Sequence, residues 1–348
     1  MTNTIIYILF FHKKTMKNKL TVIFPSRPNI NNIKWLLWCL ESQTFQDFSV
    51  IVLLDSVLTL EKFSEIEKVA LDWLKKISQK VQFISNINSD FVPQKWVSYV
   101  RNYWIKLADT EFINLFDDDE VFDPDYLQKT FDLYNELKLW APLWKGLSSI
   151  SETGDLSLKK IAVNQWNFVL VPKLMYRKTW KIQNEWFDYY NFWTTRPHQF
   201  HFNWEKFAEI QMFSGNSLFW PTKIFQKILF DERFDFVYED LEFTYRLHKS
   251  GYPIFIASEL EIHHMERDKT PLENAWIGSE FQAYRKAKHR IWFVKKHANK
   301  FQKIQFYLFG YLGCLLRFIL KILILAPKKD RKTLISAIIR GTRDWMNK

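Results

Sequence analysis

Three consecutive aspartates, Asp117–Asp119, directly follow the apolar run Phe112–Phe116. Neighbouring carboxylates repel one another and contribute nothing to an apolar core, so the cluster is costly unless a cation is present. Carboxylate oxygens are preferred ligands of Mg²⁺ and Mn²⁺, and such an ion can bridge a diphosphate and neutralise its charge as it leaves. The cluster therefore predicts a Mn²⁺ or Mg²⁺ site. The alternative is a solvated acidic turn in which Asp123 caps a helix that begins near Pro124.

Two further groups of residues could take part in such chemistry. Glu239 and Asp240 open an acidic stretch at the predicted start of a helix, where acids are favoured by the helix dipole in any case. A carboxylate beside such a site can also act as a general base that deprotonates a hydroxyl group. His263 and His264 follow the strand-like run Pro253–Ile256 and a loop. Histidines are more often structural than ligands, but a neutral imidazole can complete a metal shell.

Strand and helix patterns alternate through the first part of the chain, which positions these groups. Short apolar runs predict buried strands at Leu20–Pro25, Phe48–Leu54, Val81–Ile84 and Phe112–Phe116. Apolar residues at helical spacing predict helices at Asn31–Ser42, Leu60–Gln79 and Lys95–Lys106. This order predicts an α/β fold with a mostly parallel, Rossmann-like sheet flanked by helices. Ligands collect at the carboxyl ends of strands in such sheets, where residues 26–28, 55–56 and 117–120 fall.

The second part of the chain is less regular. Residues 140–210 are rich in aromatic side chains without a clear period, and we interpret them as an acceptor-side insertion. Regular patterns return as a predicted strand at Phe213–Phe219 and helices at Pro221–Ile228 and Glu239–Ser250. We therefore divide the chain into an N-terminal extension (1–17, with Met16 as an alternative start), a catalytic domain (18–270, with a nucleotide-binding half at 18–120 and an acceptor half at 121–270) and a basic helical tail (271–348).

The charge of the chain is concentrated in that tail. Residues 285–348 contain 17 Lys and Arg and two acids, whereas the whole chain has a net charge of +11, so the remainder is net negative. The tail also contains the apolar run Ile304–Ala326, interrupted by Arg317 and Lys321. Two cations near the centre of a spanning helix would be costly, so a helix lying in the interface of an anionic membrane is favoured. A spanning helix and an ordinary buried helix remain alternatives, and a nucleic-acid partner is disfavoured. The two cysteines, Cys39 and Cys314, lack metal-site spacing and favour a reducing compartment.

The order of the motifs resembles the family-2 glycosyltransferases of the GT-A fold over roughly residues 18–300. The matching segments are Thr21–Pro28, Leu40–Thr44, Arg101-Asn102 with Ala108 and Glu111–Ile113, Asp117–Asp119, Ser214–Asn216, Phe230–Glu232, Glu239-Asp240 and Arg246. Each segment alone is a weak signal, whereas their common order over more than two hundred residues is specific.

The resemblance implies roles for individual residues. The nucleotide base would be contacted by Pro25, Ser26, Arg27 and Asp55. Arg101 would bind the nucleotide or diphosphate. Asp117 and Asp118 would also lie on the donor side, with Asp117 and Asp119 holding ribose and metal. The metal ligands would be Asp119, the stronger candidate, with Asp117, His263 and His264. Asp240 would be the catalytic base, with Glu239 and Arg246 on the acceptor side.

Some of these roles have alternatives. Arg101 and Arg246 could instead form ordinary salt bridges. The family usually has two acids at the position of Leu54-Asp55, so the choice between a UDP- and a dTDP-linked donor stays open.

The implied function is metal-dependent, inverting transfer of a sugar from a nucleotide-diphosphate sugar to a cell-surface glycan or a lipid-linked acceptor. The enzyme would be cytoplasmic and peripheral or monotopic at the inner face of the cell membrane. Gln282 and Arg285 are followed by Lys286 instead of the Trp of processive relatives, which favours single additions. One alternative is a sugar nucleotidyltransferase, although residues 26–28 lack the Gly-rich phosphate loop that it would require. The other is a catalytically inactive nucleotide-binding membrane scaffold.

Tryptophan and glycine have unusual abundances. The chain has 16 Trp and 8 Gly, whereas Gly usually makes up about 7% of residues. Trp96 and Trp104 flank Arg101-Asn102 where the resembled family has Gly, and a glycine permits a close backbone approach that an indole does not. We hypothesise that many of these Trp codons are UGA codons that the source organism translates as Gly. The alternative is AU-rich coding combined with real aromatic enrichment in a sugar-binding cleft.

Mass spectrometry of the native protein tests this hypothesis. Peptides that cover residues 95–106 are expected to have the masses of Gly at positions 96 and 104. Peptides with Trp at both positions would contradict the hypothesis.

Overall fold

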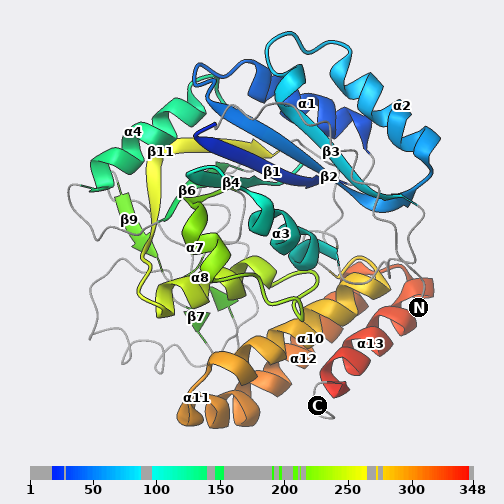
Figure 1. Cartoon of the computed structure of the whole chain (residues 1–348). Helices are drawn as coiled ribbons and strands as arrows, with labels where there is room; N and C mark the ends of the chain where they lie inside the picture. The colour runs from blue at the N-terminus through cyan, green and yellow to red at the C-terminus, as the bar shows by residue number, and fades with distance from the viewer. Residues whose placement is uncertain are drawn as a thin grey trace, which may run out of the picture.

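The computed structural model describes residues 18–26, 29–87, 96–138, 146–152, 190–191, 196–197, 207–210, 212, 217–264, 272 and 277–344. Its first part alternates strands with helices as predicted (Figure 1). The elements are β1 (Leu20–Ser26), α1 (Ile30–Glu41), β2 (Phe48–Leu58), α2 (Leu60–Leu71), η1 (Ser78–Lys80), β3 (Val81–Ile87), α3 (Trp96–Leu107), β4 (Phe112–Phe116), β5 (Glu120–Val121) and α4 (Tyr126–Lys138).

The second part adds strands from distant segments and then a run of helices. These elements are β6 (Gly146–Glu152), β7 (Tyr190–Asn191), β8 (Arg196–Pro197), β9 (Phe207–Ile210), β10 (Ser217–Pro221), α7 (Thr222–Lys227), α8 (Glu239–Lys249), β11 (Ile254–His264), α10 (Glu280–His297), α11 (Lys300–Gln305), η2 (Phe306–Gly310), α12 (Tyr311–Leu325) and α13 (Lys328–Arg343). Most of the aromatic-rich insertion at 140–210 and the Ser214–Asn216 motif lie outside the described residues.

A central nine-stranded sheet joins both parts in the order β3-β2-β1-β4-β10-β6-β11-β5, with β9 paired to β11. The strands β3, β2, β1 and β4 are mutually parallel, as the alternating pattern predicts. Beyond β4 the sheet is mixed, because β10 is antiparallel to both β4 and β6 and β11 is parallel to β6 but antiparallel to β5 and β9. The α/β fold with helices on both sides is confirmed, and the parallel part is its first half.

Each face of the sheet is covered by a separate hydrophobic cluster, which explains why the strands are apolar throughout. Leu20, Val22 and Phe24 of β1 point into one cluster together with residues of α1, α2 and α4. Ile23, between them in sequence, points into the other cluster with residues of α3, α7 and α8. This alternation follows from the two-residue period of a strand. Trp104 is buried in the second cluster, while the side chain of Trp96 lies outside what the structure describes.

Two element boundaries differ from the sequence expectation for identifiable reasons. The helix predicted to reach Gln79 ends at Leu71, because the Glu41 carboxylate accepts the backbone N–H groups of residues 75–77 at 2.7–3.0 Å and turns the chain. The loop predicted before His263 is absent from the described chain, since β11 continues from Ile254 to His264. An irregular register between Ala257 and Glu261 absorbs the extra residues.

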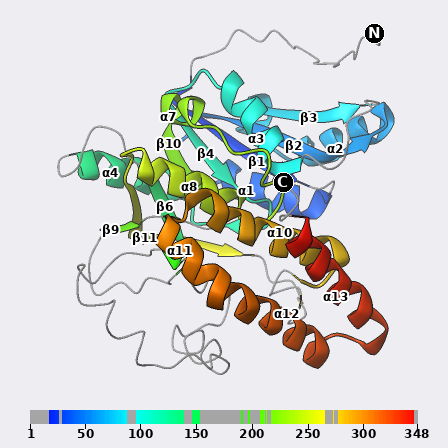
Figure 2. The ribbon, with the colours of Figure 1, turned by 90° about the horizontal axis from the view of Figure 1, so that it is seen from below.

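The C-terminal helices pack beside the sheet domain as a group (Figures 1 and 2). A π-helical segment, η2, joins α11 to α12, and such segments commonly bend helices. Among the described helices, none is by itself long and apolar enough to cross a bilayer, while the bent pair Lys300–Leu308 and Tyr311–Leu325, with 48° between its halves, meets these criteria together. The division of the chain into domains at 17, 120 and 270 stays a prediction.

Helices α10 and α13 approach each other closely at Gly341. A Cβ atom at this position would lie 2.3 Å from the backbone oxygen of Tyr284, a distance that requires one backbone to move. The Tyr284 hydroxyl donates to Asp344 at 2.8 Å, and Arg340 pairs with Glu280. The start of α10 and the end of α13 are therefore joined by both packing and polar contacts.

Substitution of Gly341 tests this packing. Gly341→Ala is expected to lower the free energy of unfolding by about 1–3 kcal/mol, because overpacking forces the helices apart. Gly313→Ala on α12 is the matched control: nothing lies within 4 Å of its Cβ position, so the higher helix propensity of Ala should leave stability equal or raise it by up to about 1 kcal/mol. Urea denaturation measures both. Equal effects of the two variants would contradict the close contact.

Candidate active site

The ends of β1 and β4 bring Ser26 close to the aspartate cluster. β1 and β4 are parallel neighbours, so Ser26 and the Asp117–Asp119 cluster leave the sheet at the same edge. The Ser26 hydroxyl donates a hydrogen bond to Oδ2 of Asp118 at 2.7 Å. Both residues were predicted to lie on the donor side, and the structure brings them together.

Arg101 of α3 joins the aspartate cluster to helix α8. Its guanidinium contacts Oδ1 of Asp117 at 3.0 Å and Oε1 of Glu239 at 3.8 Å. Arg101 is 4% exposed, and its guanidinium carbon lies 5.5 Å from the centre of the Phe230 ring. A buried arginine keeps its charge and its planar geometry, so it fixes two carboxylates from distant segments in one place. These residues are 138 positions apart at most and form one cluster.

Two acids of this cluster have raised pKa values. Burial raises the pKa of Asp117 to about 7; the charges of Asp119, Asp240 and Asp118 add to the shift, and Arg101 opposes it. Since 40% of the Asp117 side chain is exposed, solvent screens part of this effect. Burial and the charge of Asp240 likewise raise the pKa of Glu239 to about 8. Arg101 therefore leaves the surrounding acids incompletely neutralised.

The turn before Asp240 has a strained backbone that α10 supports. Val237 and Tyr238 have φ values of 60° and 82°, which are unfavourable for side chains with a Cβ and unusual for a β-branched residue. Nδ1 of His289 lies 2.7 and 3.0 Å from the carbonyl oxygens of Phe236 and Val237. Asp235, just before the turn, pairs with α10 as well, at 2.6 Å from Arg285 and 3.1 Å from His289. The contacts from α10 thus set the direction in which α8 begins.

Two supporting residues belong to recognised motifs but were not assigned a role. Asn102 exchanges hydrogen bonds with the backbone of Phe230 at 2.7 and 2.9 Å, which ties α3 to the loop before α8. Gln43 donates to the carbonyl of Asp123 at 2.8 Å and accepts from the backbone of Leu127 at 2.9 Å, which fixes the chain after the aspartates. The position of each residue within a motif was the only sequence signal of its importance. The hydrogen bonds of the two buried side-chain amides give the structural reason.

The other predicted residues are placed to different extents. Pro25 lies at the end of β1, and Asp55 lies in β2 one residue beyond Leu54, which is paired with Ser26. The side chain of Asp55 and the whole of Arg27 lie outside the described part of the structure.

The backbones of His263 and His264 pair with Val121 and Glu120, directly after the aspartate cluster. Their side chains are outside the described set. Strand pairing therefore brings the histidine segment beside the predicted metal ligands without fixing where the imidazoles lie.

Arg246 lies within a second network, which links α8 to α10. Glu242 is fully buried and accepts hydrogen bonds from Arg246 at 2.7 Å and Lys296 at 2.6 Å, with His297 at 3.1 Å. Burial opposes ionisation of Glu242, but these partners outweigh it and lower its pKa. Arg246 also donates to the carbonyl of Leu229 at 2.6 Å. These contacts match the salt-bridge alternative for Arg246, and its acceptor-side role stays a prediction.

The acids of the site suit a hard divalent cation. No three His, Cys, Asp or Glu side chains among the described residues form a complete metal-ligand group. The available donors are nonetheless carboxylate oxygens. Burial is the main cause of the raised pKa of Asp117, and repulsion from the charges of Asp119, Asp240 and Asp118 adds to it. Oε2 of Glu239 is itself buried and has no hydrogen-bond partner within the described structure. A cation near Asp117 and Asp119 would relieve this repulsion, and oxygen ligands favour Mg²⁺ or Mn²⁺.

Comparison with known proteins places this geometry on a known fold. No protein-family model and no curated protein sequence match the chain. A structure of S. aureus TarS residues 1–349 in complex with UDP-GlcNAc matches 93% of this chain and 81% of its own, with a TM-score of 0.53 and 16% identity. The mannosyltransferase PcManGT from Pyrobaculum calidifontis, in complex with GDP-Man and Mn²⁺, matches 95% of this chain and 88% of its own, with a TM-score of 0.51 and 13% identity. The fold is that of glycosyltransferases. At these identities the likeness establishes the fold alone.

The raised pKa values predict how pH acts on stability. Asp117 and Glu239 keep protons in the folded protein that the unfolded chain has already released above its ordinary carboxylate pKa. The two protonated carboxyl groups therefore favour the folded state fully below about pH 4. This stabilisation falls as the pH rises and is lost once the pH has passed through about 7 to 8.

A double variant isolates this contribution. Relative to the wild type, Asp117→Asn/Glu239→Gln is expected to gain on the order of 2 kcal/mol of unfolding free energy between about pH 5 and about pH 8, after allowance for solvent screening. Urea denaturation in a metal chelator measures the difference. Asp109→Asn, at an exposed site before β4, is the control and should show no such gain. A difference between wild type and double variant that does not change with pH would contradict the assignment.

Proposed function

We propose that the protein is a metal-dependent glycosyltransferase that moves a sugar from a nucleotide-diphosphate sugar to an acceptor hydroxyl. One observation carries the proposal: Arg101 contacts both Asp117 and Glu239, which brings the aspartate cluster after β4 and the acids at the start of α8 to one place. The glycosyltransferase fold provides the context for this arrangement. Donor groups and a potential base would then belong to a single cluster.

The donor side is formed by the carboxyl ends of β1, β2 and β4. Ser26 and Asp118, which are hydrogen-bonded, would position the nucleotide together with Pro25, Arg27 and Asp55. Arg101 would contact the diphosphate, since a guanidinium suits phosphate oxygens. Asp117 and Asp119 would hold Mn²⁺ or Mg²⁺, with His263 or His264 as a further ligand. A bound ion would supply positive charge for the diphosphate as it leaves.

Asp240 is the proposed catalytic base. Its charge acts on both Asp117 and Glu239, so its carboxylate lies close to the donor cluster. In a single displacement the acceptor oxygen forms a bond to the anomeric carbon while the bond from that carbon to the diphosphate oxygen breaks. The leaving diphosphate takes the bonding electron pair, and Asp240 takes the proton of the acceptor hydroxyl. The configuration at the anomeric carbon is inverted.

The location of Asp240 at a helix start matches this role. The N-terminus of α8 provides a positive dipole that favours an ionised carboxylate, whereas the neighbouring Glu239 has its pKa raised to about 8 by burial and by Asp240 itself. The two adjacent acids would divide the work. Asp240 accepts the proton, and Glu239 fixes Arg101 beside the diphosphate.

The donor sugar is left open by the base-binding segment. Its position after β2 has Leu54-Asp55, and UDP- and dTDP-linked sugars are both compatible with it. The proposed acceptor is a hydroxyl of a cell-surface glycan or a lipid-linked saccharide, and a single sugar is added per encounter.

The variant Asp240→Asn tests the assignment. It is expected to reduce turnover by about 100-fold or more, because general-base catalysis contributes at least that factor, while the dissociation constant for the donor changes less than about threefold. A panel of nucleotide sugars is screened for Mn²⁺-dependent release of nucleoside diphosphate, and the active donor is used for calorimetric binding. Asp109→Asn is the matched control and should behave as the wild type.

The outcomes separate the alternatives. Turnover that survives Asp240→Asn would exclude Asp240 as the base. A wild type that binds a nucleotide sugar but turns over no donor of the panel would indicate the nucleotide-binding scaffold instead. Release of pyrophosphate from a nucleoside triphosphate and a sugar phosphate would indicate a nucleotidyltransferase. Activity that persists after complete removal of divalent ions would contradict the metal site.

A further inference from the structure

The C-terminal helices expose a continuous apolar stripe. Residues four positions apart are neighbours on a helix surface, and the stripe consists of such residues in α11, η2 and α12. Each is at least half exposed: Ile304, Leu308, Leu312, Leu316, Leu320 and Ile324. Phe301, Tyr307, Leu323 and Leu325 widen it. A contiguous exposed surface of this kind on a folded protein usually marks an interaction site.

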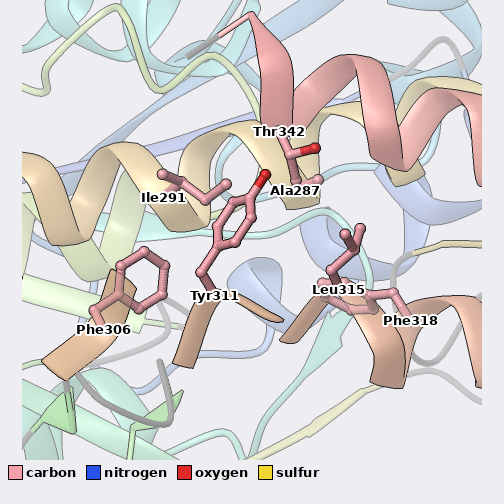
Figure 3. A pocket seen from close by; sticks show the side chains of 7 residues that line it. All are labelled: Ala287, Ile291, Phe306, Tyr311, Leu315, Phe318 and Thr342. Atoms are coloured by element: carbon pink, nitrogen blue, oxygen red, sulfur yellow. The ribbon is translucent and has the colours of Figure 1, made fainter. Parts of the chain in front are cut away.

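The opposite side of α12 already has its partners in the fold. Phe318 and Ile322 are buried against Ala287 of α10 and residues of α13. The guanidinium of Arg290 lies 5.3 Å from the Phe318 ring centre. Figure 3 shows the Tyr311 ring directed from α12 into the small apolar pocket that α12 forms with Ile291 and Thr342. Since α12 is apolar on both sides and the described residues cover one of them, their packing does not account for the exposed side.

The surface around the stripe is strongly basic. Residues 300–344 contain ten Lys and Arg and two acids. Lys300, Lys321, Lys328, Lys329 and Lys332 are exposed. An apolar stripe bordered by lysines is complementary to the interface of a bilayer that contains anionic lipids, because the leucines enter the acyl boundary and the ammonium groups meet the head groups.

We propose that the exposed side of α11, η2 and α12 docks into the interface of an anionic lipid bilayer, with the lysines of α13 bordering it. The arrangement favours this occupant over a second copy of the chain, because two such surfaces would bring like charges together. It also favours lying in the interface over spanning. α12 packs against α10 and α13, and the bent pair of helices has an exposed charge at Lys321.

The docking surface is one helix away from the candidate active site. Ala283, Ala287 and Ile291 of α10 face α12 and α13, whereas Arg285 and His289 contact Asp235 and the turn before Asp240. If the proposed function holds, docking would hold the site close to the head-group layer, where a lipid-linked acceptor presents its hydroxyl. The docking itself requires no catalysis and is tested without it.

Vesicle sedimentation of the full chain tests the docking. The wild type is expected to bind vesicles that contain about one-third phosphatidylglycerol at least tenfold more tightly than vesicles of phosphatidylcholine alone, and added salt should weaken this binding. Lys328→Gln/Lys329→Gln/Lys332→Gln should lose about fivefold per charge on the anionic vesicles. Leu312→Gln/Leu316→Gln/Leu320→Gln should lose more than about tenfold on both compositions, because it removes apolar side chains that would leave water.

Matched controls and other occupants give the remaining outcomes. Trp35 and Trp38 on α1 are each 51% exposed, so Trp35→Gln/Trp38→Gln removes comparable apolar surface elsewhere and should bind as the wild type. Equal binding of the leucine variant and the wild type would overturn the proposal. A wild-type dimer that becomes monomeric in the leucine variant, with no vesicle binding, would show that a second copy covers the stripe. Resistance to extraction by high salt and alkaline carbonate would indicate a spanning helix and overturn interfacial docking.

Failure here is separable from failure of the proposed function. Vesicle binding is measured without a nucleotide sugar, and donor hydrolysis is measured without vesicles. A protein that hydrolyses a donor but ignores anionic vesicles would lose only the docking proposal.

Discussion

The ion pair between Arg101 and Asp117 is the contact on which the arrangement of the site depends. Removing a guanidinium from water is costly unless its partners are well placed, and Arg101 is 4% exposed. The carboxylates of Asp117 and Glu239, which the guanidinium contacts, offset part of this cost. The helix of Arg101, α3, is itself tied to the loop before α8 through Asn102, so two sets of contacts join the aspartate segment to α8. The carboxyl ends of β1 and β4, on the proposed donor side, are thereby joined to α8 in one unit.

A bound cation would improve the charge balance of this unit. Arg101 provides one positive charge among Asp117, Asp119, Glu239 and Asp240, and the pKa values of Asp117 and Glu239 rise in consequence of burial and of their neighbours. Proteins tolerate such clusters at functional sites, where the repulsion is relieved by a ligand. The strained φ values of Val237 and Tyr238 are a second cost at the same place. The raised pKa values and the strained backbone both lie beside Asp240, the proposed base, whose role would require a precise position.

The sequence predicted what depends on local pattern. Apolar runs located β1, β2, β3 and β4, and the rule that parallel strands end at one edge predicted that Ser26 would meet the aspartate cluster. The left-handed turn at Val237 and Tyr238 was not predictable, because neither residue favours positive φ and the contacts that hold it come from α10, about 50 residues later. The network around Glu242 was missed for the same reason, since Lys296 and His297 reach it only in the folded chain. The end of α2 also differs from the prediction, because the distant Glu41 side chain accepts hydrogen bonds from the backbone beyond it.

Helix α10 connects the two proposed activities of the chain through its opposite sides. Residues two positions apart on a helix face away from each other, so Ala287 packs toward α12 and α13 while Arg285 and His289 support the turn before Asp240. Gly341 permits the backbone of α13 to lie against Tyr284 of the same helix. A displacement of α12 or α13 would therefore reach the strained turn through a single rigid element instead of a flexible linker. This geometry makes the C-terminal helices part of the support of the turn before Asp240, and it places the proposed docking surface against the body of the protein and not on a separate tail.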